Sequence, residues 1–89
     1  MRKSIHSARA KLLQDLLRLV RQEADLTQVE VAARLGILQA TVSNYERGER
    51  RLDLIELWQV CDALGVDVRD FVQRYVEICR DAEERTPAG

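Results

Sequence analysis

The 89 residues of this chain suffice for one compact domain, and 46% apolar but only 4% aromatic residues, with one Pro and four Gly, favour helices over sheets. No apolar run reaches membrane-spanning length and no signal-peptide pattern opens the chain, so we expect a cytoplasmic protein with no membrane partner. One histidine, His6, and two cysteines without C-x-x-C spacing, Cys61 and Cys79, argue against a metal site. No cofactor is expected.

The apolar periodicity predicts an all-α fold of five helices joined by short connections. In chain order, these are expected over residues 7–24, 27–34, 38–46, 54–64 and 68–84. Four of them follow a capping residue: Ser7, Thr27, Asp53 and Asp67. We expect residues 1–6 to form a flexible basic tail, residues 7–84 a single domain, and residues 85–89 a loose C-terminus.

Residues 27–46 carry the most informative pattern, two short helices hinged at Gly36, which tolerates positive φ. Their expected shared core is Val31, Leu35, Ile37, Val42 and Tyr45. The second helix has an outward polar face of Gln39, Ala40, Ser43, Asn44 and Arg47. Two helices joined by a tight glycine turn, with short amides and hydroxyls facing out, suit an element that enters the DNA major groove.

Charge is unevenly distributed along the chain. Residues 1–52 carry a net charge of +4 and residues 53–89 one of −5, so the total of −1 hides a basic half. Binding to DNA depends on local phosphate contacts rather than on the charge of the whole chain. The basic half, which holds the two-helix unit, is therefore the expected side for DNA.

The segment L-T-Q-V-E-V-A-A-R-L-G-I-L-Q-A-T-V-S-N-Y-E-R-G-E-R resembles the helix-turn-helix of the phage repressor/Cro (XRE) family. Its continuation L-D-L-I-E-L-W-Q-V-C-D-A-L-G-V-D-V-R-D-F resembles the fourth helix and the start of the fifth in that family. The likeness covers about residues 12–72. It implies a lambda-repressor-like DNA-binding domain of five helices, in which helices two and three form the helix-turn-helix.

The resemblance also implies roles for single residues. Candidates for reading base edges are Gln39, Ala40, Ser43 and Asn44. Candidates for phosphate contacts are Gln28, Thr41, Arg47, Arg50 and Arg51. Gln28 matches a position that contacts phosphate and often supports the first glutamine of helix three, which here is Gln39. An amide of this kind can pair with adenine in the major groove.

Three further positions are informative. In the family, the residue matching Glu46 pairs with an arginine of helix one, which implies a partly buried Arg21–Glu46 ion pair; the alternative is that Glu46 accepts from cytosine N4. Leu38 stands where the family usually has a capping residue. We expect it to pack into the core near Val42 rather than touch a base. Leu52 replaces a common proline.

Helices four and five suggest a second surface. Helix four has an expected stripe of Leu54, Leu57, Trp58, Cys61 and Leu64. Helix five has a wide apolar arc whose second half has little of the domain left to cover it, which indicates an interface. We expect a homodimer through helix five, with candidate residues Ile55, Trp58, Tyr75, Ile78 and Cys79. The alternative is that helix one folds back over this surface.

These features together predict sequence-specific binding of double-stranded DNA by a transcriptional regulator, most simply a homodimeric repressor on a near-palindromic operator. Rival interpretations are an antitoxin that binds a toxin and its own promoter, a restriction–modification controller, and a phage switch protein. An enzyme is not expected, because the sequence offers no nucleophile–base pair, metal cluster or phosphate loop. The expected location is the nucleoid of a prokaryote, with a prokaryotic or phage gene.

Overall fold

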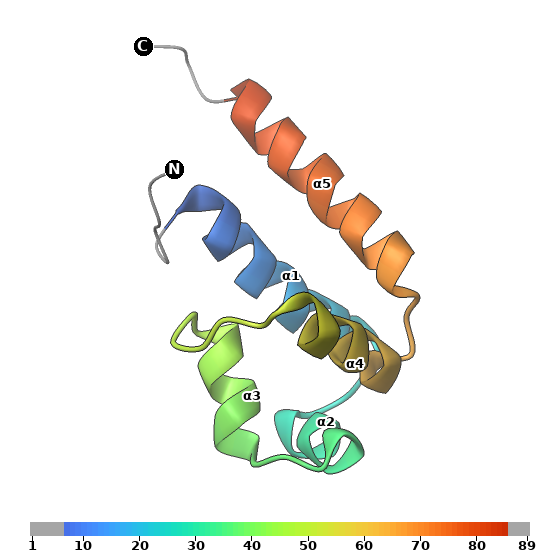
Figure 1. The fold of residues 1–89 in the computed structure, drawn as a ribbon. Helices are drawn as coiled ribbons and strands as arrows, with labels where there is room; N and C mark the ends of the chain where they lie inside the picture. The colour runs from blue at the N-terminus through green and yellow to red at the C-terminus, as the bar shows by residue number, and fades with distance from the viewer. Residues whose placement is uncertain (1–6, 86–89) are drawn as a thin grey trace.

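The computed structural model describes residues 7–85 of the chain, and over that range it consists of helices and short connections (Figure 1). The helices are α1 (Ala8–Glu23), α2 (Gln28–Leu35), α3 (Gln39–Glu46), α4 (Leu54–Leu64) and α5 (Val68–Arg85). The predicted all-α architecture of five helices is confirmed, and their ends lie within one or two residues of those expected. The tail at 1–6 and residues 86–89 lie outside the described residues.

Local hydrogen bonds explain where the helices begin. The Ser7 hydroxyl accepts from the backbone N–H of Ala10 at 3.1 Å. Capping boxes open α2, through Thr27 and Glu30, and α4, through Asp53 and Glu56. α3 begins after Leu38 with no side-chain cap, as the sequence predicted. Its first turn therefore lacks the stabilisation of about 1 kcal/mol that an N-cap side chain contributes.

One contiguous core joins all five helices. α1 runs through the middle of the molecule, with α2 and α3 below it in Figure 1 and α5 alongside it. The buried residues are Leu16, Leu17, Val20, Leu26, Val31, Ala32, Val42, Tyr45, Val60, Cys61, Leu64 and Phe71. Ala32 has a small side chain, which leaves room for the turn from α2 to α3. Its carbonyl accepts a hydrogen bond from the N–H of Ile37 at 3.0 Å. Gly36 takes φ 68° in that turn.

Three apolar side chains, Ile37, Leu38 and Leu54, lie outside the core where the sequence pattern predicted them inside it, and Trp58, a candidate for an interface, is exposed as well. Ile37 is 39% exposed and Leu38 is 75% exposed, because the turn carries both to the outer end of the molecule. On α4, Leu54 is 70% exposed and Trp58 57%, whereas Val60 is buried. The apolar arc of α4 is wider than the surface its neighbours cover, so its core-facing edge is Leu57, Val60, Cys61 and Leu64.

The second half of α5 is covered by α1, which is the alternative that the sequence left open. The Tyr75 hydroxyl donates to the carbonyl of Arg9 at 2.8 Å, and Cys79 is buried. Ile78 is partly buried against the core. The expectation that this stretch lacks cover is therefore wrong, and Cys79 is not available as an interface residue.

Exposed ion pairs also join α1 to α5. Arg74 donates to both carboxylate oxygens of Glu23, at 2.7 and 2.9 Å, and Arg9 donates to Glu83 at 2.7 Å.

None of the helices in residues 7–85 is both long enough and apolar enough to cross a membrane.

Candidate nucleic-acid interface

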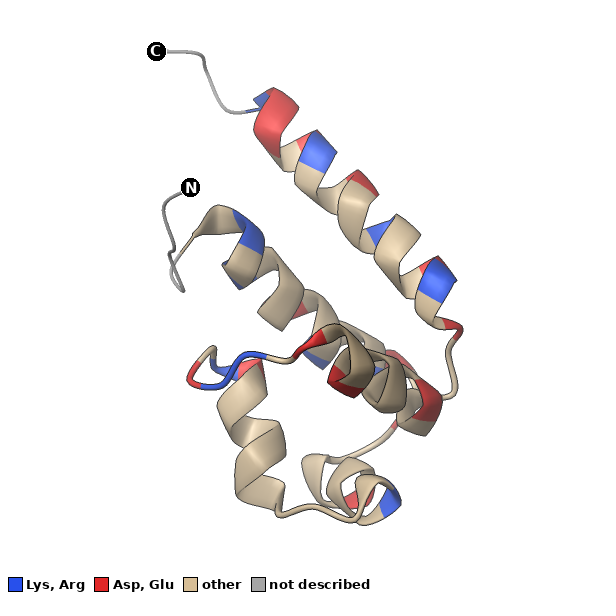
Figure 2. Ribbon diagram, viewed as in Figure 1, with Lys and Arg blue, Asp and Glu red and all other residues tan. Residues whose placement is uncertain are grey.

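α3 presents an outward face without charge. Gln39 and Ala40 are exposed and Ser43 and Asn44 half-buried, while Val42 and Tyr45 point into the core. In Figure 2, α3 carries no charged residue before its C-terminal end, where the sequence has Glu46. We call Gln39, Ala40, Ser43 and Asn44 the reading face. It offers amides, a hydroxyl and a methyl group, which are the groups that recognise base edges.

The single acidic residue of α3 is turned away from this face. Glu46 is only 2% exposed. Its carboxylate accepts from Arg21 Nε at 2.7 Å and from Arg21 Nη2 at 3.0 Å, so the predicted ion pair is present. This contact raises the pKa of Arg21 above its ordinary value. The pair ties α3 to α1 and removes a negative charge that would repel phosphate.

Two more side chains complete the surroundings of Glu46. Gln28 Nε2 donates to Glu46 Oε1 at 3.1 Å, and Arg18 Nε lies 3.7 Å from the same oxygen. Among residues 7–85, no buried side-chain polar atom lacks a hydrogen-bond partner. Gln28 also accepts from Gln39 Nε2 at 3.5 Å, so the acid is linked to the reading face. The Gln28–Glu46 contact was not predicted from the sequence.

The three arginines predicted to contact phosphate follow α3 directly. Arg47 Nη2 donates to Asn44 Oδ1 at 2.8 Å and to Glu49 Oε2 at 3.1 Å. Arg50 donates to Glu56, the acid of the α4 capping box. Figure 2 shows basic positions and an acidic one gathered in this loop beside α3. By sequence, the acidic residue is Glu49. Arg47 and Arg50 therefore rest against carboxylates in the protein without DNA.

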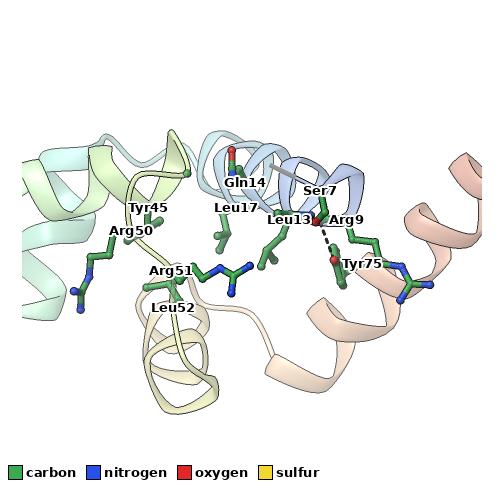
Figure 3. A pocket seen from close by; sticks show the side chains of 12 residues that line it. Ser7, Arg9, Leu13, Gln14, Leu17, Tyr45, Arg50, Arg51, Leu52 and Tyr75 are labelled. Atoms are coloured by element: carbon green, nitrogen blue, oxygen red, sulfur yellow. Dashed lines mark hydrogen bonds between the residues drawn. The ribbon is translucent and has the colours of Figure 1, made fainter. Parts of the chain in front are cut away.

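A cleft lies behind this loop, between α1, the loop and α5 (Figure 3). Its volume is about 320 Å³, and apolar side chains of Leu13, Leu17 and Leu52 line it beside Tyr45 and Tyr75. Arg51 extends along the cleft, whereas Arg50 points away from it. Gly48, at φ 80°, leaves room for Gln14, whose Nε2 would lie 2.3 Å from an added Cβ. The loop is thus packed against α1.

No group of three or more His, Cys, Asp or Glu residues able to hold a metal ion occurs in residues 7–85. Cys61 and Cys79 are free and buried. Burial raises the pKa of the Cys61 thiol to about 11, so this sulfur stays protonated at neutral pH and acts as a small apolar group.

The chain resembles known proteins in sequence over most of its length. The family model described as Helix-turn-helix matches residues 17–71. Over its whole length, the chain is 38% identical to the HTH-type transcriptional regulator y4dJ of Sinorhizobium fredii, 95% of which is covered. A stretch of 56 residues, 63% of the chain, is 36% identical to antitoxin HipB of Escherichia coli K12 and covers 64% of that protein.

Solved structures agree in fold. An XRE-family like protein from Pseudomonas syringae pv. tomato has a TM-score of 0.77 and 43% identity, with 83% of this chain and 90% of that chain covered. The restriction-modification controller protein C.Esp1396I, solved as a tetramer with its natural 35 base-pair operator, has a TM-score of 0.74. Its identity is 21%, over 81% of this chain and 95% of that one, so this likeness concerns the fold alone.

Proposed function

This chain belongs to the XRE family of helix-turn-helix proteins, and we propose that it is a transcriptional regulator that binds double-stranded DNA sequence-specifically through α3. The family is one of DNA-binding regulators, in line with the expectation that the chain is not an enzyme. Such a protein works at the nucleoid, in the cytoplasm of its host.

The observation that carries this proposal is the contrast between the two sides of α3. The outward side is uncharged and polar, while the one acid of the helix is buried against Arg21. A helix that reads base edges needs donors and acceptors without a carboxylate facing the phosphates. Each good bidentate contact to a base supplies about 1–3 kcal/mol of discrimination.

Backbone contacts would come from the residues around the reading face. Thr41 flanks it, Gln28 lies at the start of α2, and the loop after α3 supplies Arg47, Arg50 and Arg51. Contacts with phosphate position the protein and add affinity without specifying a sequence. On DNA, phosphates would replace Glu49 and Glu56 as acceptors for Arg47 and Arg50.

Leu38 lies beside the reading face and, in this proposal, also contacts a base. It precedes Gln39 directly, and its side chain is 75% exposed although it is apolar. The thymine methyl group is the apolar feature of the major groove. With the packing role excluded by its exposure, contact with a thymine methyl becomes the better interpretation of Leu38.

A homodimer remains the proposed oligomeric state. Its interface is now placed in the groove between α4 and α5 instead of at the end of α5. This α4–α5 groove has a volume of about 760 Å³ and is lined by Leu54, Trp58, Asp62, Asp67, Val68, Arg69, Val72 and Gln73. A second copy fits it, because a two-fold interface pairs a patch with itself and the rim carries both signs of charge. Of the candidates predicted from the sequence, Ile55 and Trp58 stay exposed.

A two-fold dimer would place two α3 helices in successive major grooves. The half-sites of its operator would then be related by a near-palindrome and spaced by about 10–10.5 base pairs, or one turn of DNA. Repression would follow where this site overlaps a promoter and excludes polymerase.

Selection of binding sites from random duplexes tests the proposal. We expect Gln39→Ala and Asn44→Ala to weaken binding to the selected duplex and to spare binding to unrelated DNA. Arg50→Ala should weaken both and flatten the salt dependence by about one unit of log–log slope. If Gln39→Ala and Asn44→Ala leave specific binding intact, α3 is not the reader.

An antitoxin is the second candidate, favoured by the 36% identity to HipB and by the exposed apolar patch on α4. In that case a toxin, rather than a second copy, would cover Trp58. The test is genetic: a toxin encoded beside this gene should arrest growth alone and be neutralised by co-expression of this chain. Growth arrest that persists on co-expression would reject the antitoxin function.

A further inference from the structure

The cleft behind the loop after α3 has the features of a ligand site. It lies between α1, the loop and α5 (Figure 3), and its volume of about 320 Å³ is at the lower end of the range for small-molecule sites, about 300–1,000 Å³. We propose that this cleft binds a small organic anion with an apolar body, and that the bound anion holds Arg51 and thereby weakens binding to DNA. The second part of this inference rests on the proposed function of the loop arginines.

The apolar part of the cleft suits the body of such a ligand. Leu13 and Leu17 from α1 and Leu52 from the loop line it, together with Tyr45 and Tyr75. Of these, Leu13, Leu52 and Tyr75 are only partly buried against the core. A ligand in the cleft would therefore cover apolar surface that the rest of the chain leaves open to water, and removing that surface from water favours binding.

The charged part of the lining has one sign. Three arginines, Arg9, Arg50 and Arg51, contribute to the cleft, and no acidic residue of the described range 7–85 does. Arg9 donates to Glu83. Arg50 points away from the cleft (Figure 3) and donates to Glu56. Arg51 extends along the cleft. A carboxylate is the group that matches its guanidinium, because an arginine can donate two parallel hydrogen bonds to it.

Tyr45 brings a polar group to the same cleft. The residue is only 3% exposed, and its hydroxyl makes no hydrogen bond to any other residue of the range 7–85. Because every fully buried side-chain polar atom of that range has a partner, this hydroxyl must reach a surface, and Tyr45 lines the cleft. Burial raises the pKa of the Tyr45 hydroxyl. It therefore stays protonated and can donate a hydrogen bond to an anion.

The position of Arg51 connects the cleft to DNA binding. Arg51 belongs to the loop that follows α3 and is one of the proposed phosphate contacts. A guanidinium held by a carboxylate in the cleft cannot contact a phosphate at the same time. The anion and DNA would therefore compete for Arg51, and each should weaken the binding of the other by the same factor.

Two probes of nearly the same shape test the site, 2-naphthoate and its uncharged counterpart 2-naphthamide. Isothermal titration calorimetry without DNA should give a Kd for 2-naphthoate about tenfold or more below that for 2-naphthamide, as expected of a charge-assisted contact. Arg51→Gln should remove this preference. Tyr45→Phe should weaken the binding of 2-naphthoate by about fivefold. It should leave the Tm nearly unchanged, because the hydroxyl has no partner to lose in the described part of the chain.

Two further variants locate the site. Arg69→Gln is the matched control, because it removes an exposed arginine from the α4–α5 groove, the other apolar hollow that could take a naphthalene ring. It should leave the Kd of both probes unchanged. Ala10→Leu adds apolar volume to the wall of the cleft and should abolish the binding of both probes. Circular dichroism of each variant confirms that it is folded.

Competition with DNA is measured on a duplex selected by the unaltered protein, over a salt series. Saturating 2-naphthoate should lower the slope of log Kd against log salt by about one unit, which is the loss of one phosphate contact. An equal concentration of acetate, which lacks the apolar body, should not change it. Arg51→Gln should show the lower slope already, with no further change when 2-naphthoate is added.

The titrations and the DNA measurements can fail separately. No binding of 2-naphthoate, equal affinity for the two probes, or binding that Arg69→Gln weakens as much as Arg51→Gln would overturn the inference about the cleft. Binding of 2-naphthoate that leaves the salt slope unchanged would overturn its link to DNA. Failure to select any duplex would reject the proposed function and this link with it, while the titrations would still decide whether the cleft binds an anion.

Discussion

The helix-turn-helix unit, α2 and α3, and the α4–α5 pair use charged residues in different ways. At α3 the acid Glu46 is buried and bonded to Arg21. On α4 and α5, ion pairs such as Arg69–Asp67 lie on the surface, while large apolar side chains such as Trp58 are exposed. Burying a charge costs more than exposing an apolar group, so each arrangement needs its own reason.

This difference indicates which kind of partner each region binds. Around α3, buried polar contacts hold exposed amides in fixed directions, which suits a surface that distinguishes one base from another. On α4 and α5, the surface offers apolar area with charges around it, which suits a protein partner. The two proposed interfaces thus lie on different elements, and changes in one should leave the other working.

The largest expected effect comes from breaking the buried ion pair. Arg21→Met leaves the carboxylate of Glu46 buried without its main partner, and removal of one member of such a pair costs about 3–5 kcal/mol. We expect a loss of this order in the free energy of unfolding, measured by urea denaturation. Arg18→Met is the control, because that arginine is 44% exposed and its contact is long.

The double variant Arg21→Met/Glu46→Leu sharpens this test. With both charges gone, no buried charge is left without a partner, and stability should return toward that of the unaltered protein. DNA binding should remain impaired, because Gln28 has lost its acceptor. A double variant as unstable as Arg21→Met alone would show that the pair is needed for packing rather than for charge balance.

The second effect concerns association. Trp58→Ala should leave the stability of the monomer within about 0.5 kcal/mol, because the side chain is exposed. It should weaken self-association by about thirtyfold or more if Trp58 anchors the interface, the size of an interface hot spot. Sedimentation equilibrium measures this change. Leu38→Ala is the matched control, because it also removes an exposed apolar side chain without adding a cap to α3, and it should affect DNA binding but not self-association.

The oligomeric state of the unaltered protein separates the two candidate partners. A second copy in the α4–α5 groove requires the unaltered protein to be dimeric. Unaltered protein that is monomeric at micromolar concentration, with and without DNA, would contradict the homodimer and leave a different protein as the occupant of the groove.

A smaller effect is expected at the loop after α3. Glu49 accepts from Arg47 in the free protein and competes with phosphate for it. Glu49→Gln should raise the affinity for unrelated DNA a few-fold at low salt, since exposed pairs of this kind are worth about 1 kcal/mol or less. Fluorescence anisotropy over a salt series measures it.

Glu77→Gln serves as the control for this change, because it removes the same charge from α5, where Glu77 accepts from Gln73. If both variants raise the affinity equally, the cause is net charge rather than release of Arg47. An effect confined to Glu49→Gln would tie the loop specifically to phosphate binding.

The parts that could be predicted from the sequence depend on short-range geometry. Thr27 with Glu30 forms the capping box three residues apart, and Gly36 takes positive φ in a turn whose length the pattern fixes. The pairing of Arg21 with Glu46 spans 25 residues, and resemblance to a family, rather than periodicity, predicted it.

The parts that were missed depend on which neighbour covers a given side chain. Periodicity places Trp58 and Cys61 on adjoining parts of one helix, but it does not say that only Cys61 meets another helix. The Tyr75 hydroxyl donates a hydrogen bond to the carbonyl of Arg9, which is 66 residues away in the sequence. No local sequence pattern predicts such a contact. The hydrogen bond from Gln28 to Glu46 depends on the angle between α2 and α3, which the glycine turn allows but does not specify.

The smallest expected effect is on acid stability at the edge of the α4–α5 groove. Asp67 accepts from the side chain and the backbone N–H of Arg69, which lowers the pKa of Asp67 to about 2. Because the folded pKa lies below the ordinary value, the stabilisation is fully present above about pH 4. It is lost as the pH falls through 2. Asp67→Asn should therefore lower the Tm slightly at pH 6 and not at pH 2.

Arg69→Ala provides the companion measurement, because it removes the partner and leaves the carboxylate. It should reduce the difference in Tm between pH 6 and pH 2 in the same direction as Asp67→Asn, since either change abolishes the bond between the two side chains. The side chain of Arg69 is 88% exposed, so the effect should shrink further in high salt. A Tm difference that high salt leaves unchanged would mean that Asp67 acts mainly as the cap of α5, through the backbone N–H of Arg69, rather than as one side of an ion pair.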